Sequence, residues 1–120
     1  MKRILSATLL VLAAGSSSAL AQPVPEESRK DLWCGLAFTI VAEGAPTDVT
    51  EDQRLIIQQF AEGGDLLVGR AKASHLENGY SEETFAPYLE TLKADVEVQV
   101  NATDKATPYS FEECSALLGL

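Results

Sequence analysis

The chain has few of the residue types on which most enzymes and metal proteins depend. It has one histidine and two cysteines among 120 residues, and 9 basic side chains against 18 acidic ones. So few lysines and arginines argue against nucleic-acid binding, because basic groups hold the phosphates. They also disfavour binding to anionic membrane surfaces. The composition favours a well-solvated protein, with cationic partners as the weaker alternative.

No catalytic, metal or cofactor motif stands out. The serine-hydrolase G-x-S-x-G motif, the phosphate loop and the dinucleotide fingerprint are absent. No acidic cluster alternates its carboxylates through a glycine turn as a calcium loop does. His75 lacks neighbours placed as catalytic or zinc partners, and we interpret it as a surface or capping histidine near a helix end. We therefore expect no enzymatic activity, no metal and no cofactor.

Long hydrophobic runs are absent after the N-terminus. The run over residues 4–14 has about 11 residues, whereas a membrane span needs roughly 20. It lies between the basic start Met1-Lys2-Arg3 and the A-x-A cleavage site at 19–21. We interpret residues 1–21 as a bacterial-type signal peptide that is removed. No cysteine is placed for a lipid anchor, so the expected location is periplasmic or secreted.

The remaining chain is expected to form one domain. Removal of residues 1–21 leaves 99 residues, in which seven basic side chains face 18 acidic ones, because Lys2 and Arg3 are lost. Residues 22–27 contain two prolines and predict a flexible leader. Residues 28–120 predict a single helical domain.

Two helices are predicted in the first half of this domain, where apolar residues recur every three or four positions. The first should start at Ser28 as its cap and end near Gly44. The second should start with a capping box of Thr50 and Gln53, and end at Asn78-Gly79. Its predicted inner face consists of Leu55, Ile56, Phe60, Leu67 and Ala71.

Two further helices are predicted in the second half. Ser81 should cap the third helix, and Ser110-Phe111-Glu112-Glu113 is the capping box of a short last helix whose inner face includes Phe111. The alternating valines of residues 95–100 also fit a short strand, but we favour helix because no second strand could pair with it. The predicted fold is all-α, a compact bundle of four to five helices.

Cys34 and Cys114 lie on apolar faces of the first and last predicted helices. In an exported protein they are expected to form a disulfide. The 79 residues between them are unlike the C-x-x-C spacing of redox-active pairs. We therefore predict a permanent link, worth at most ~4.5 kcal/mol on a loop-entropy basis.

Two further features of the sequence allow alternative interpretations. Gly63-Gly64 interrupts the second helix and predicts a kink, a break that could act as a hinge, or a close helix crossing. Six aromatic residues at helical spacing are more often core, but they could also line a pocket for an apolar ligand. They are Trp33, Phe38, Phe60, Phe85, Tyr88 and Phe111.

These expectations favour two function classes. In size, export, helicity and a single bridge, the chain is similar to the acid-stress periplasmic chaperones of the HdeA type. The resemblance holds at the level of class, and it implies a non-enzymatic envelope protein that binds an unknown protein partner and loosens in acid. The alternative is a small helical carrier of an apolar ligand.

Overall fold

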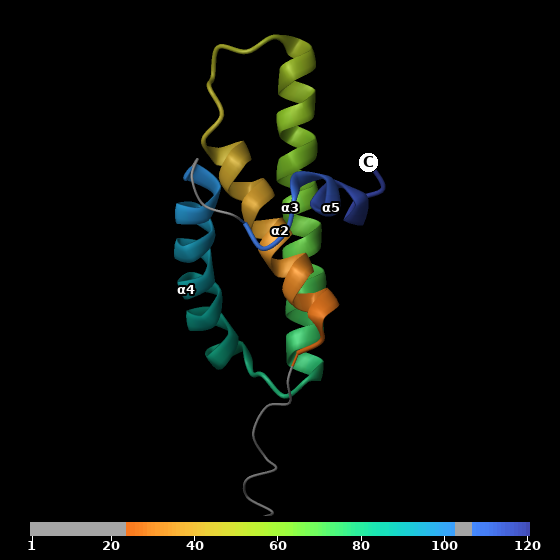
Figure 1. The fold of residues 1–120 in the computed structure, drawn as a ribbon, viewed down its shortest axis with the longest axis vertical. Helices are drawn as coiled ribbons and strands as arrows, with labels where there is room; N and C mark the ends of the chain where they lie inside the picture. Colours follow the sequence, from red (N-terminus) through yellow and green to blue (C-terminus); the bar gives the residue numbers. More distant parts are fainter. Residues whose placement is uncertain (1–23, 103–106) are drawn as a thin grey trace, which may run out of the picture.

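A computed structural model describes residues 24–102 and 107–120, and this part of the chain contains four helices and no strand. The predicted all-α class is confirmed. The predicted signal peptide lies outside the described residues. Figure 1 shows the four helices, which are α2 (Glu26–Glu43), α3 (Glu51–Glu77), α4 (Glu82–Asn101) and α5 (Phe111–Leu117).

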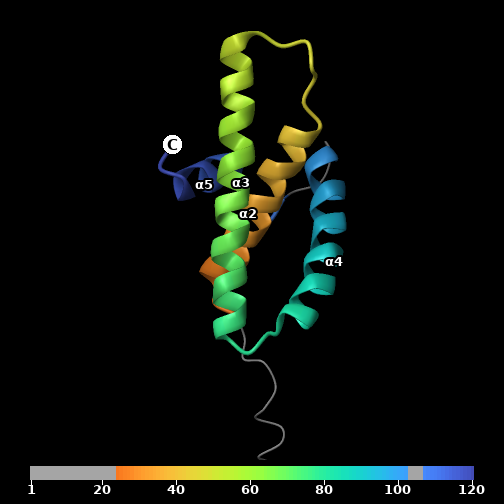
Figure 2. The ribbon, with the colours of Figure 1, turned by 180° about the vertical axis from the view of Figure 1, so that it is seen from behind.

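α2 is the central helix. It packs against α3 and also contacts α4 and α5, so that α4 and α3 lie on opposite sides of it (Figures 1 and 2). Almost every residue from Asp31 to Ile40 is buried. The middle turns of α2 have no polar face, as is typical of a helix that other elements enclose on all sides.

α2 begins two residues before the predicted Ser28. Its N-cap is Pro25, and Glu26 and Glu27 form its first turn, so these two glutamates do not belong to a leader. Proline suits this place because its fixed φ is compatible with a helix start. Ser28 is buried, and its hydroxyl donates to that of Ser74 in α3. The prediction that Ser28 caps the helix is wrong, because its side chain joins two helices.

The other predicted helix boundaries are confirmed. Thr50, Ser81 and Ser110 each accept a hydrogen bond from the third backbone amide of the following helix, and all three form capping boxes. α3 ends before Gly79, which has φ 102°. Residues 95–100 lie within α4, which confirms helix over strand.

A close helix crossing occurs at the glycine pair. α3 runs without interruption through Gly63 and Gly64. A Cβ atom added to Gly64 would lie 2.8 Å from the carbonyl oxygen of Gly35 in α2, and one added to Gly35 would lie 2.9 Å from that of Gly64. A Cβ at Gly63 would overlap Leu118, which follows α5. The absence of side chains lets two backbones meet here.

The predicted disulfide is present. Cys34 of α2 and Cys114 of α5 are bonded, with Cα atoms 5.3 Å apart, and both residues are buried. The bond therefore links the first and last described helices, and it holds α5 on the central helix.

The first turns of α3 have little cover. They rise above the end of α2, and the linker of residues 44–50 runs beside them (Figures 1 and 2). Leu55 and Ile56 are 56% and 50% exposed, so the predicted inner face is wrong at these positions. It is correct at Leu67 and Ala71, which are fully buried where α2 covers α3.

Candidate functional site

The six candidate aromatic residues divide into two groups. Trp33, Phe38 and Phe111 line a hollow beside the disulfide, with Phe60 stacked on Phe38 at 5.3 Å between ring centroids. Phe85 and Tyr88 lie in α4 and surround His75. No single pocket therefore contains all six.

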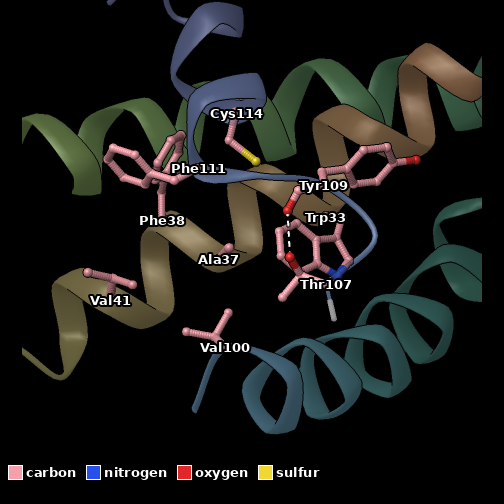
Figure 3. Close-up of a pocket in the computed structure, with 9 residues that line it drawn as sticks. All are labelled: Trp33, Ala37, Phe38, Val41, Val100, Thr107, Tyr109, Phe111 and Cys114. Carbon is pink, nitrogen blue, oxygen red and sulfur yellow. Dashed lines mark hydrogen bonds between the residues drawn. The ribbon is translucent and has the colours of Figure 1, made fainter. Parts of the chain in front are cut away.

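The hollow is apolar and small. Its volume is about 220 Å³, and its walls come from α2, the end of α4, α5 and the segment leading into α5 (Figure 3). Phe38 and Phe111 meet edge to face at 6.1 Å between centroids, as do Trp33 and Tyr109 at 5.9 Å. Among the described residues, none of the lining side chains is charged. Typical ligand sites measure about 300–1,000 Å³, so this hollow has room for one side chain or a short apolar group.

Tyr109 belongs to this site although the sequence analysis did not select it. Its hydroxyl donates to the Glu26 carboxylate of α2, and burial together with this bond raises the pKa of Tyr109 to about 12. The same bond, followed by the one from Arg29, lowers the pKa of Glu26. The available signal was an apolar residue directly before the Ser110 capping box, where such residues often pack on the first turns of the helix.

Large apolar side chains also gather on the outer surface beside the hollow. We call this surface the α3–α5 face. Ile56 borders three shallow hollows of this surface, and Phe111 borders both one of them and the aromatic hollow. Phe111 is 63% exposed, so its predicted place on an inner face is wrong. The face is formed by Val41, Leu55, Ile56, Phe60, Phe111 and Leu120.

His75 is fully buried, so the interpretation as a surface or capping histidine is wrong. Its Nδ1 lies 2.7 Å from the carbonyl oxygen of Ala71, and its Nε2 has no hydrogen-bond partner among the described residues. Its ring packs against those of Tyr80, Phe85 and Tyr88 at 5.1–5.4 Å between centroids. The missed signal was the four-residue spacing from Leu67 through Ala71 to His75.

An ion pair between buried Asp31 and exposed Arg70 joins α2 and α3. Asp31 is 8% exposed and accepts two hydrogen bonds from the Arg70 guanidinium, each of 2.8 Å. The bond to Asp31 raises the pKa of Arg70. Nothing in the sequence predicts this tertiary contact, because a pairing across 39 residues leaves no periodic signal.

Comparisons with protein-family models, curated proteins and solved structures find no match. In residues 24–102 and 107–120 no helix is long and apolar enough to cross a bilayer. The same ranges contain no group of three or more His, Cys, Asp or Glu residues that could hold a metal ion.

Proposed function

We propose that this chain is an exported protein that acts through contacts with other proteins and not by catalysis. The observation that carries the proposal is the α3–α5 face, in which exposed apolar side chains of α2, α3 and α5 line neighbouring hollows that share Val41, Ile56 and Phe111. Single exposed apolar residues are normal on any protein. Contiguous ones typically mark an interaction site.

A chaperone-like role in acid fits the way α5 is held. Backbone hydrogen bonding at Ser110 and the proximity of Lys30, 3.8 Å away, lower the pKa of Glu113. A carboxylate with a lowered folded-state pKa stabilises the fold above its ordinary pKa of 4.5, and this contribution is lost as the pH falls through the folded-state value. Acid therefore weakens the attachment of α5, while the disulfide keeps the helix close to α2.

Loosening of α5 would enlarge the apolar surface. Leu118 covers Gly63, and Phe111 contacts both Phe38 and Phe60. Movement of these side chains uncovers the glycine crossing and the aromatic hollow together. The expected consequence is stronger binding of unfolded proteins near pH 3, where most carboxylates are protonated.

Aggregation of an unfolded client protein tests this function. A guanidinium-unfolded client is diluted at about pH 3 and about pH 7, with and without an equimolar amount of residues 22–120, and light scattering is followed. Suppression that is lost in Ile56→Ser and Phe111→Ser, but kept in Val98→Ser, is the expected result. Val98 is a matched control because it is 57% exposed and lies on α4. No suppression at either pH would contradict the proposal.

The aromatic hollow favours a second function, that of a carrier of a small apolar ligand. Its uncharged lining of aromatic and aliphatic side chains supports this function, whereas its volume of about 220 Å³ limits the ligand to a short chain or one ring. A thermal-shift screen with medium-chain fatty acids and aromatic hydrocarbons tests it. A rise in melting temperature that disappears in Ala37→Phe, which narrows the hollow, would favour the carrier.

A further inference from the structure

The α3–α5 face has an acidic border. The charged residues that line its shallow hollows are Asp48, Glu62 and Glu112, and within the described ranges no lysine or arginine lines them. All three carboxylates are exposed. A partner of this surface must therefore supply apolar side chains for the centre and positive charge for the acidic border.

The charge of the surrounding elements points the same way. Residues 44–66, which contain the linker and the first half of α3, carry five acidic side chains and one basic side chain. That basic residue, Arg54, is paired with Glu51. Arg29 and Arg70 form ion pairs with Glu26 and Asp31. The positive charges of these arginines are therefore compensated locally, and the potential over the face stays negative.

We propose that the α3–α5 face binds a cationic amphipathic helix of another protein, one with an apolar stripe flanked by lysines and arginines. The proposal rests on the proposed protein-binding function, and it names the class of partner bound near neutral pH, where the carboxylates of the border are ionised. The apolar stripe would cover Ile56 and Phe111, and the basic flanks would approach Asp48, Glu62 and Glu112. Laying an amphipathic helix on an apolar surface is a recurring mode of peptide recognition.

A second copy of the chain is a poorer occupant. Two copies would bring the same acidic borders together, and residues 22–120 carry 18 acidic against 7 basic side chains. Like charges that face each other across an interface oppose association. The same charge disfavours an anionic lipid surface. A basic helix is the occupant whose charge complements the border.

Binding of two synthetic peptides tests the proposal. Each has about 18 residues, roughly 27 Å as a helix, with the same leucine stripe, and the polar positions are all lysine in one and all glutamate in the other. Fluorescence anisotropy with residues 22–120 at about pH 7 should show at least about tenfold tighter binding of the lysine peptide at low salt. Raising the salt from about 0.05 to 0.3 M should weaken it several-fold.

Charge and apolar contributions are separated by two sets of variants. The triple variant Asp48→Asn, Glu62→Gln, Glu112→Gln should bind the lysine peptide at least about fivefold more weakly. The control Glu83→Gln, Glu90→Gln, Glu97→Gln removes as many carboxylates from exposed sites on α4 and should leave binding unchanged. Ile56→Ser should weaken the binding of both peptides, and Val98→Ser that of neither.

The outcomes separate this inference from the function on which it depends. Equal binding of both peptides, abolished by Ile56→Ser, would keep the protein-binding face and overturn its cationic specificity. Binding of neither peptide, with intact helix content by circular dichroism, would overturn both. Dimerisation of the chain at micromolar concentration, lost in Ile56→Ser, would assign the face to a second copy and also overturn the inference.

Discussion

At the scale of single residues, the packing of α2 on α3 depends on positions that carry no side chain. Gly35 and Gly64 approach each other through backbone atoms, whereas Gly69, one helical turn and a half further along α3, would have nothing within 4 Å of an added Cβ. Replacement by alanine should therefore lower the stability of the fold at Gly64 and raise it at Gly69, although both residues lie in α3. This contrast makes the close crossing open to experiment.

Gly64→Ala should destabilise the fold by about 1–3 kcal/mol, because the added Cβ would lie 2.5 Å from the Thr39 hydroxyl and 2.8 Å from the Gly35 carbonyl. Gly69→Ala should stabilise it by roughly 0.5–1 kcal/mol, since alanine favours helix over glycine. Urea unfolding followed by circular dichroism measures both. Equal effects of the two substitutions would show that the helices do not cross as described.

Tyr109 predicts a loss of stability in alkali. Its folded-state pKa is raised from 10.0 to about 12, so its contribution is complete below pH 10.0 and is lost as the pH rises to about 12. Tyr109→Phe removes the ionising group and should flatten the fall of the urea midpoint over this range. If the wild-type chain and Tyr109→Phe decline in parallel, burial and the bond to Glu26 do not raise the pKa of the Tyr109 phenol.

At the scale of elements, the starts of α3, α4 and α5 were predictable, whereas the start of α2 and the partners of the helices were not. The capping boxes at Thr50 and Ser110 are local, because each depends on residues three positions apart. Burial depends on which element lies opposite. The apolar residues from Ile56 to Ala71 have the spacing of one helical face, yet α2 covers only the part that contains Leu67 and Ala71.

The candidate site shows the same limit. Trp33, Phe38 and Phe111 were selected as aromatic residues at helical spacing, and the structure brings them together around one hollow. Nothing in the spacing indicated that Phe85 and Tyr88 would instead enclose His75. Residues far apart in sequence are assembled by tertiary packing, which periodicity does not encode.

The end of α3 and the start of α4 are joined through His75. His75→Ala should destabilise the fold by about 2–4 kcal/mol, because it leaves a cavity among three aromatic rings. His75→Phe should cost less than about 1.5 kcal/mol. A carbon in place of the unpartnered Nε2 leaves no polar group unsatisfied. Equal losses in the two variants would indicate that the ring packing contributes little.

At the scale of the whole molecule, one covalent bond links the two ends of the described fold. The Cys34–Cys114 bond spans 80 positions and fixes a seven-residue helix that is too short to be stable alone. α5 supplies Phe111 to the apolar face, and Leu118, which follows α5, covers Gly63 at the glycine crossing. The apolar face and the glycine crossing therefore both depend on the disulfide.

The double variant Cys34→Ser, Cys114→Ser should lose up to about 4.5 kcal/mol of unfolding free energy. This is a large share of the roughly 5–15 kcal/mol typical of a domain. Reduction of the unmodified chain should give the same loss in thermal unfolding. A reduced chain that melts within about 2 °C of the oxidised one would contradict a stabilising role.

Site-specific photo-crosslinking tests most directly whether the α3–α5 face is where this protein binds others. A photoreactive phenylalanine analogue replaces Ile56 in one variant and Val98 in another, both at positions at least half exposed. Each variant is irradiated with the guanidinium-unfolded client at about pH 3. The account predicts abundant client adducts at position 56 and few at position 98. Equal yields at the two positions, or adducts mainly at position 98, would contradict it.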